Sequence, residues 1–376
     1  MKTTLSVIKA DIGSIGGHEK PSKAIVNRIT EIIDSAKPLL ISDYSIFSVG
    51  DDNVILMVHK NGVDNPSIHK LAWDAFTEGT KVAKSQGLYG AGQDMLINSF
   101  SGNVKGLGPG SCEMEFEERP NEPFLLFMCD KTNPGVFNLP FFRSFADPFH
   151  NAGFLLSTEI AKGFEFTIMD VTDVKNDRII VLNAPQDYYD LATLLRDPET
   201  YVIESIRSRA NGDIAVVVST SRLHNIAGTY TGKDDPVALV RSQKSFPSTG
   251  EILSPWATAH FVAGDNRGSH HVPVMPVKLF STISFFDGPA IVQAAGFCVH
   301  DGKLTEYVDL FDHPFWRTIQ DKAARKFMDI REQGFFNPAM VGMNELEYTG
   351  VVEKIKVLNK KFKIRKKKKH TLIESS

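Results

Sequence analysis

Cysteine is scarce in this chain, which contains only Cys112, Cys129 and Cys298 among its 376 residues. These cysteines form no Cys-x-x-Cys pair and cannot all join in disulfides, because their number is odd. The scarcity argues against a disulfide-stabilised secreted scaffold and favours a reducing compartment. We therefore expect a cytoplasmic protein.

Long hydrophobic runs are also missing. No apolar stretch reaches the length that spans a bilayer, and no secretory hydrophobic region follows Met1-Lys2-Thr3-Thr4-Leu5. We find no internal repeat and no linker rich in proline or serine. A soluble protein with one large domain is expected, and its hydrophobic fraction of 42% is ample for a large core.

Positive charge is unevenly distributed. The net charge is −3 at pH 7, but residues 360–370 carry eight Lys or Arg and no acid. The rest of the chain is therefore distinctly acidic, which favours carboxylate-rich metal chemistry over nucleic-acid binding by the folded surface. We expect a single domain over residues 1–355 and a basic, disordered tail over residues 356–376. The alternative is that this tail binds nucleic acid or another partner.

Several predicted strands have an acidic residue at or just beyond one end. Residues 5–11 alternate in polarity and end in Asp11, Gly50-Asp51-Asp52 links two predicted strands, and the apolar strand 124–129 precedes Asp130. One such placement is usually a turn, whereas several suggest that different segments converge on hard cations. Because the ligands are oxygens with little Cys or His, the pattern favours Mg²⁺ over zinc.

The loop 228–236 places Lys233 directly beside Asp234 and Asp235. A lysine that attacks a carbonyl must spend time as the neutral amine, whereas adjacent anions keep it charged. The conflict disappears if metal ions neutralise the carboxylates, or if the carboxylates point away while the lysine works. We therefore predict a loop that switches between a lysine-in and an aspartate-in state, with Gly228 and Gly232 as hinges. A solvated turn with an ion pair is the alternative.

Glycine-rich segments at 87–94 and 101–110 are typical of loops whose backbone amides approach anions. Neither matches a P-loop or a dinucleotide-binding motif. Arg267 lies between loop glycines, where it suits either phosphate recognition or a structural pair with Asp265.

Sequence periodicity predicts the remaining elements. Helices are expected from Pro21, from Asn65-Pro66 and over 315–331, and strands over 38–49, 54–58, 164–169 and 213–218. A helical pattern is also predicted over 187–209. A further helix is expected after Pro236, through Val240, carrying Arg241, Gln243 and Lys244.

Taken together, the long motifs resemble the archaeal-type bifunctional fructose-1,6-bisphosphate aldolase/phosphatase family over about residues 4–350. They are ADIGSIGGH at 10–18, GDD at 50–52, GLYGAGQD at 87–94, SGNVKGLGPG at 101–110, DKTNPGVFNLP at 130–140, TYTGKDDP at 229–236, GDNRGSHHVPVMPV at 264–277 and FDGP at 286–289. Two features depart from the family pattern: Asn266 stands where threonine is expected, and the lysine-rich tail matches no motif.

The resemblance implies an α/β, single-domain four-layer α-β-β-α sandwich that assembles into a homo-octamer. It implies several Mg²⁺ ions held by Asp11, His18, Asp51, Asp52, Gln93, Asp130, Asp234 and Asp235. The implied partners are small sugar phosphates, with no membrane and no nucleic acid.

The resemblance also implies two activities in one site. Lys233 would form a Schiff base with dihydroxyacetone phosphate, Tyr230 would move the proton during aldol condensation, and Asp11 would be the general base for Mg²⁺-dependent removal of the 1-phosphate. The sugar and its phosphates would contact His18, Tyr89, Gly102, Asn103, Lys131, Gln243, Lys244, Arg267, Asp287 and Tyr348. The alternative is a sugar-bisphosphate phosphatase without aldolase activity.

Overall fold

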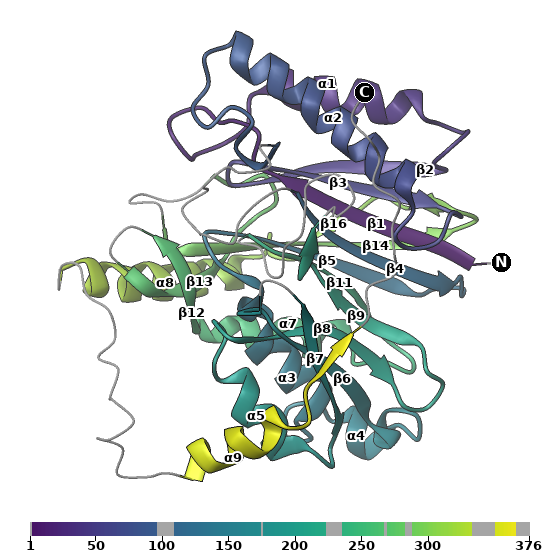
Figure 1. Cartoon of the computed structure of the whole chain (residues 1–376), viewed down its shortest axis with the longest axis vertical. Coiled ribbons are helices and arrows are strands. Elements are labelled where there is room, and N and C mark those ends of the chain that lie inside the picture. The colour runs from purple at the N-terminus through teal and green to yellow at the C-terminus, as the bar shows by residue number, and fades with distance from the viewer. Residues whose placement is uncertain are drawn as a thin grey trace.

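Two β-sheets and the helices around them form a mixed α/β fold in the computed structural model (Figure 1). The structure describes residues 2–95, 109–173, 176–222, 235–266, 269–282, 288–332 and 350–365. Among these residues, no helix is both long enough and apolar enough to cross a membrane.

The smaller sheet is antiparallel and has the strand order β10-β4-β1-β3-β2. Its strands are β1 (Lys2–Ala10), β2 (Asp43–Val49), β3 (Asp52–His59), β4 (Gly110–Glu117) and β10 (Ser221–Arg222). The predicted strands at 5–11 and 54–58 are thus confirmed, whereas the strand predicted over 38–49 begins only at Asp43.

Strand β1 is buried on both faces, and its alternating residues serve two different cores. Leu5 and Val7 belong to the large hydrophobic cluster between the sheets. Ile8 and Ala10 belong to a second cluster beneath the helices. Since side chains alternate along a strand, Lys9 and Asp11 share the face that looks toward the larger sheet.

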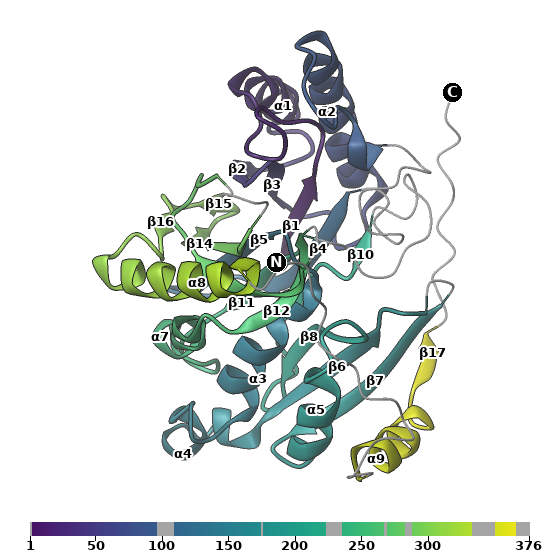
Figure 2. The same ribbon diagram turned by 90° about the vertical axis from the view of Figure 1, so that its left-hand side faces the viewer.

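Helices α1 (Lys23–Ser35) and α2 (Pro66–Ser85) cover the outer face of the smaller sheet (Figures 1 and 2). Ile25, Ile29 and Phe76 pack into the cluster beneath them. The Ser22 and Asn65 side chains cap their first turns, which fits the predicted starts to within two residues.

The larger sheet follows the order β12-β13-β14-β5-β11-β9-β8-β6-β7-β17, with β15 and β16 paired to β14. Its bounds are β5 Pro123–Asp130, β6 Phe164–Asp170, β7 Asp177–Ala184, β8 Tyr201–Ser208, β9 Ile214–Val218, β11 Val237–Arg241, β12 Phe261–Asn266, β13 Ser269–Pro276, β14 Ala290–His300, β15 Lys303–Leu304, β16 Val308–Asp309 and β17 Lys363–Arg365. The predicted strands at 124–129, 164–169 and 213–218 are confirmed as β5, β6 and β9.

Most remaining helices lie beside this larger sheet (Figure 2). They are α3 (Asn138–Ala146), α4 (Gly153–Leu156), α5 (Tyr188–Leu195), α7 (Thr249–Leu253), α8 (Pro314–Glu332) and α9 (Gly350–Asn359), with short 3₁₀ turns η1 (Gln93–Met95), η2 (Pro134–Phe137), η3 (Ile160–Lys162) and η4 (Ser254–Thr258). Phe127 of β5 stacks on Trp256, and Phe137 stacks on Phe141 of α3. These rings fix the sheet to the helices next to it, and α8 confirms the helix predicted over 315–331.

Two predicted helices are wrong. The helical pattern over 187–209 holds only for α5, after which the chain continues as β8. The segment after Pro236 is strand β11, fully buried between β5 and β9. Short apolar runs do not distinguish a buried strand from a buried helix, and pairing on both sides decides for the strand here.

The expected domain boundary at residue 355 falls inside α9. Beyond it, Lys363–Arg365 forms β17 and pairs antiparallel with the edge strand β7. Arg365 adds ion pairs to Glu204 and to Asp177. The expectation of a disordered tail from residue 356 is therefore wrong as far as Arg365, because this segment completes a sheet edge, and residues 366–376 lie outside the described residues.

Candidate active site

Separate chain segments bring acids to one end of the interface between the sheets. Asp11 follows β1, Asp51 lies in the turn between β2 and β3, Asp52 begins β3, and Asp130 ends β5. Ligand atoms of Asp11, His18 and Asp51 lie within 4.8 Å of one another, as do those of Asp51, Asp52 and Asp130. The structure thus brings these five predicted metal ligands together.

Lys131 lies inside this acidic cluster. Its Nζ is 3.3 Å from Asp51 Oδ1 and 3.3 Å from Asp130 Oδ1. Asp235 joins the cluster because its Oδ1 accepts a hydrogen bond of 2.5 Å from the Lys131 backbone amide. Both Lys131 and Asp235 have left-handed backbones, with φ of 63° and 58°. The Asp235 amide donates back to the Thr132 carbonyl at 2.5 Å, so the two segments hold each other in this conformation.

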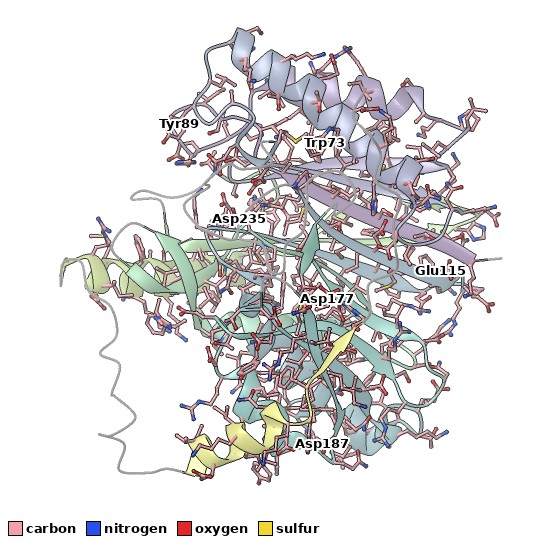
Figure 3. All side chains as sticks on the ribbon, in the orientation of Figure 1. Trp73, Tyr89, Glu115, Asp177, Asp187 and Asp235 are labelled. Atoms are coloured by element: carbon pink, nitrogen blue, oxygen red, sulfur yellow. The ribbon has the colours of Figure 1, made fainter. Side chains whose placement is uncertain are left out.

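His18 and Tyr89 form the outer side of the cluster. His18 Nδ1 lies 3.0 Å from Asp51 Oδ2, and the ring edge of His18 meets Tyr89 with centroids 4.9 Å apart. Tyr89 is 55% exposed, so its ring is available to a ligand at the rim. Figure 3 shows Tyr89 and Asp235 on the same side of the molecule.

Two close loop contacts place the glycine-rich segment beside Asp11. Asp94 Oδ2 accepts from the Asp11 amide at 2.9 Å, and the Asp94 amide donates back to the Asp11 carbonyl at 3.0 Å. Gly13 and Gly92 have φ of +128° and +84°, and a Cβ on either would come within 3 Å of Ala83 or Thr80. Glycine is therefore required at both positions, and Gln93 follows directly in η1.

Lys9 and Asp94 were missed by sequence reasoning. Lys9 is fully buried and forms an ion pair with Asp52. The alternation of residues 5–11 already placed Lys9 on the face that carries Asp11, and that signal was sufficient to find it. Asp94 offered no comparable signal, because its role depends on two loops meeting.

Burial and neighbouring charges shift the pKa values of these acids in different directions. Burial, reinforced by neighbouring carboxylates, raises the pKa of Asp11 and of Asp130 well above the ordinary 3.8. Asp51 is also buried, but His18 and Lys131 outweigh that effect and lower its pKa. Burial likewise opposes the charge on Lys131, whose pKa is nevertheless raised by Asp130 and Asp51. The cluster therefore has more negative charge than its lysines neutralise.

These residues fit a divalent metal ion. Asp130 is fully buried, and within the described part of the chain its carboxylate has no hydrogen-bond partner and a single ion pair, to the Lys131 ammonium that it shares with Asp51. A buried carboxylate is normally satisfied by donors or by a cation. Clustered carboxylate oxygens are the ligands that Mg²⁺ and similar hard ions prefer.

Several predicted site residues lie outside the described residues. They are Gly102, Asn103, Tyr230, Lys233, Asp234, Arg267, Asp287 and Tyr348, together with the predicted hinges Gly228 and Gly232. The motif that contains Arg267 does approach the cluster through its backbone, because Gly264 pairs with Thr132 in an isolated bridge.

Gln243 and Lys244 do not join the cluster of their own chain. They follow β11, whereas Asp235 precedes it, and the six steps along the chain from Asp235 to Arg241 span roughly 20 Å at about 3.3 Å per residue. Lys244 Nζ instead donates to the Pro120 carbonyl at 2.7 Å. Both residues have left-handed backbones, with φ of 69° and 56°, so they form a tight turn at the far end of the sheet.

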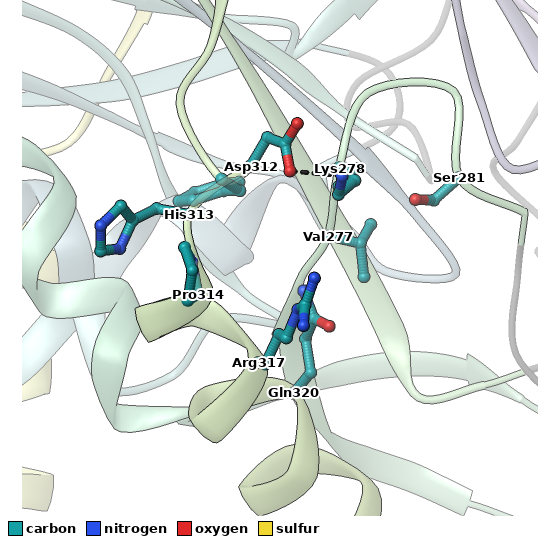
Figure 4. Close-up of a pocket in the computed structure, with 9 residues that line it drawn as sticks. Val277, Lys278, Ser281, Asp312, His313, Pro314, Arg317 and Gln320 are labelled. Carbon is teal, nitrogen blue, oxygen red and sulfur yellow. Dashed lines mark ion pairs between the residues drawn. The ribbon is translucent and has the colours of Figure 1, made fainter.

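A separate pocket lies between the segment after β13 and the start of α8 (Figure 4). Lys278 and Asp312 form an ion pair across it, and Arg317 projects from the helix. None of the predicted site residues that the structure describes lines this pocket. Ser281 links it to the turn that carries Asp51, since the Ser281 carbonyl accepts a hydrogen bond from the amide of Gly50.

Comparison with known proteins assigns the chain to a family. The model of a family described as fructose-1,6-bisphosphatase matches residues 2–363. A fructose-1,6-bisphosphate aldolase/phosphatase of Thermus thermophilus is 51% identical over 362 residues, which cover 96% of this chain and 100% of the relative. Proteins of the same name from Methanothermobacter marburgensis and Cenarchaeum symbiosum are 46% and 47% identical, covering 94% and 96% of this chain and 98% and 95% of those relatives. The chain therefore belongs to the fructose-1,6-bisphosphatase family that these relatives represent.

Proposed function

We propose that the chain is a bifunctional gluconeogenic enzyme that makes fructose 1,6-bisphosphate and then hydrolyses it. Dihydroxyacetone phosphate and glyceraldehyde 3-phosphate would condense, and removal of the 1-phosphate would leave fructose 6-phosphate and phosphate. The observation that carries this proposal is the buried group of Asp51, Asp52 and Asp130, whose negative charge demands cations. The activity named for the relatives supplies the substrate.

The proposed ligands of several Mg²⁺ ions are Asp11, His18, Asp51, Asp52, Gln93, Asp130, Asp234 and Asp235. Bound Mg²⁺ would polarise the 1-phosphate and activate water. Lys131 would neutralise and orient the phosphate, and its ammonium already lies between Asp51 and Asp130. The unpaired state of all three cysteines fits the expected cytoplasmic location.

Asp11 is the proposed general base of the hydrolysis. The Gly13 amide donates to Asp11 Oδ1 at 3.1 Å, and Asp94 holds the Asp11 backbone from the other side. These contacts fix the direction of the carboxylate, and no hydrogen bond among the described residues uses its Oδ2. That oxygen would accept the proton of the attacking water.

Lys233 is the proposed nucleophile of the aldol reaction. Its neutral amine would attack the ketone carbon of dihydroxyacetone phosphate, and loss of water would give a Schiff base. Tyr230 would move the proton while the new carbon–carbon bond forms. Tyr89, Gly102, Asn103, Arg267, Asp287 and Tyr348 are proposed to hold the sugar and its phosphates.

The loop that carries Lys233 is proposed to alternate between lysine-in and aspartate-in states. Support comes from its C-terminal end, where Asp235 is hydrogen bonded to the Lys131 amide and so is fixed in the acidic cluster. Gly232→Pro should uncouple the two reactions more than it lowers stability. Rates of both half-reactions and the melting temperature test this expectation, and unchanged rates would contradict it.

We further propose a single-domain, four-layer α-β-β-α unit that assembles as a homo-octamer. Within one chain Gln243 and Lys244 lie at the opposite end of β11 from Asp235. If they hold substrate phosphate, they must therefore enter the site of a neighbouring copy. Assembly would then complete the active site.

Trapping of the Schiff base tests the proposed function. The protein is incubated with dihydroxyacetone phosphate, reduced with borohydride and digested for peptide mass spectrometry. A reduced adduct on Lys233 is expected. Its absence, with Mg²⁺-dependent phosphate release intact, would leave the alternative of a phosphatase without aldolase activity, and consumption of triose phosphates decides between the two.

A further inference from the structure

A second group of metal-ligating side chains lies away from the proposed active site. Asp64, His69 and Glu113 each place one ligand atom within 4.8 Å of the others. Asp64 lies just before α2, His69 is in the first turn of α2, and Glu113 is on β4. The group therefore joins a loop, a helix and a strand under the start of α2.

This group is remote from the acidic cluster. Strand β3 begins at Asp52, in that cluster, and ends at His59, about 23 Å away at about 3.3 Å per residue. Ser6, the partner of Glu113 in β1, lies on the helix-covered face, opposite to the face of Asp11. In Figure 3, Glu115 of the same strand as Glu113 lies on the opposite side of the molecule from Tyr89 and Asp235.

His69 gives the strongest indication of a ligand. The residue is 4% exposed, yet neither ring nitrogen has a hydrogen-bond partner among the described residues. Its Nε2 nonetheless lies 3.2 Å from Glu113 Oε2. Leaving a buried polar group unsatisfied is unfavourable, and a metal ion bound by both the His69 nitrogen and the Glu113 carboxylate would satisfy it.

Glu113 is held in place by a chain of hydrogen bonds. His59 Nδ1 accepts from the Asn61 amide at 3.2 Å, so its Nε2 carries the proton and donates to Ser6 Oγ at 2.8 Å. Ser6 in turn donates to Glu113 Oε1, and the Asp64 amide donates to Glu113 Oε2 at 2.6 Å. Such outer contacts orient a carboxylate ligand before the metal arrives.

We propose that Asp64, His69 and Glu113 bind a divalent transition-metal ion of the Zn²⁺ class. Imidazole nitrogen and carboxylate oxygen are both ligand types that Zn²⁺ accepts, and water could fill the open position, whereas Mg²⁺ prefers oxygen alone. The exposed Asp64 provides the entry path. The bound ion would fasten the start of α2 to β4, and α2 ends just before Tyr89 and Gln93.

Asp64→Asn tests the proposal with little risk to folding. The side chain is exposed, and asparagine tolerates the left-handed backbone of this position, where φ is 57°. Asp74→Asn is the matched control, since Asp74 lies on α2, like His69, and pairs only with the exposed Lys70 among the described residues. Wild type and both variants are loaded with Zn²⁺ in excess Mg²⁺, gel filtered, and analysed for zinc per chain by elemental mass spectrometry.

Asp64→Asn is expected to retain one zinc ion fewer per chain than wild type and Asp74→Asn. It is also expected to lose a Zn²⁺-dependent rise in melting temperature that the other two proteins show. Zinc bound in the acidic cluster adds the same amount to the zinc content of all three proteins, so it does not affect the difference between them. Equal zinc content and equal thermal shifts in the three proteins would overturn the proposal. The three side chains would then only connect α2 to β4 through hydrogen bonds and ion pairs.

Discussion

At the scale of single residues, Asp130 lowers the stability of the metal-free protein at neutral pH but is required for the proposed function. Burial raises its pKa well above 3.8, so the folded, metal-free chain favours the protonated acid. The contribution of the protonated Asp130 side chain to folding stability is therefore fully present below pH 3.8, the pKa of this group in the unfolded chain. It is lost as the pH rises through the raised pKa of the folded state. Bound metal would reverse this penalty at neutral pH.

Asp130→Asn should therefore stabilise the metal-free protein at neutral pH, because the variant carries no buried carboxylate that must be protonated or paired. The advantage over wild type should shrink as the pH falls, because wild-type Asp130 then becomes neutral. Denaturant unfolding across acidic and neutral pH measures this difference. The variant should also lose Mg²⁺-dependent phosphate release, and a destabilised variant at neutral pH would contradict the account.

Lys9 is the second residue with a clear expected effect. Lys9→Met removes the buried ammonium that pairs with the Asp52 carboxylate, and breaking this buried ion pair should cost about 3 kcal/mol. Because the site becomes more negative, added Mg²⁺ should raise the melting temperature more in this variant than in wild type. Lys2→Met, which breaks an exposed pair with Glu115, is the control and should lower the stability far less, because water screens exposed ion pairs. Equal losses in both variants would show that Lys9 does not support Asp52.

Sequence alone predicted the acids of the site because strand ends and turns are local features. It placed Asp11, Asp51 and Asp130 at such positions, and the structure brings them together. It did not find the contact of Asp94 with Asp11, which depends on two loops meeting between distant elements. It also listed Gln243 with the site residues, although β11 carries it away from Asp235.

At the scale of elements, the fold was predictable where periodicity was long. Helices α1, α2 and α8 show a sustained apolar stripe, and their predictions are confirmed. Strand β11 has only five residues, all buried, and carries no alternation that distinguishes it from a helix. Its neighbours β5 and β9 decide its conformation, and they lie far from it in sequence.

Strand β17 allows a prediction about the basic tail. Deleting residues 360–376 removes the pairing of Lys363 with Ile179 and the contact of Phe362 with Tyr201. The melting temperature should fall measurably, while Mg²⁺-dependent phosphate release should persist. Differential scanning fluorimetry and a phosphate assay measure the two effects. Loss of tight, salt-sensitive RNA or DNA binding on deletion would instead support the nucleic-acid alternative.

At the scale of the whole molecule, the separation of Lys244 from Asp235 predicts a shared active site. Lys244→Ala should lose about 2 kcal/mol or more of transition-state stabilisation, and Asp130→Asn should be inactive. When the two variants are co-expressed with different tags and purified as mixed assemblies, some sites contain neither substitution. Activity should then return.

The control is a mixture of the two variants purified separately, which should stay inactive unless subunits exchange. Mixed assemblies that remain as inactive as their parents would show that Lys244 serves no neighbouring site. Sedimentation analysis of each preparation verifies that both variants still assemble.

The alternation of β1 has a consequence for how this chain tolerates insertions and deletions. Odd-numbered residues of this strand face the other sheet and even-numbered ones face the helices. Adding or removing one residue before Lys9 would turn its ammonium toward α1 and α2 and drive an apolar side chain against Asp52. A point substitution in β1 changes the packing on one face of the strand only, whereas a change of length moves every following side chain to the opposite face. Natural length variation should therefore be confined to the loops beyond the ends of β1.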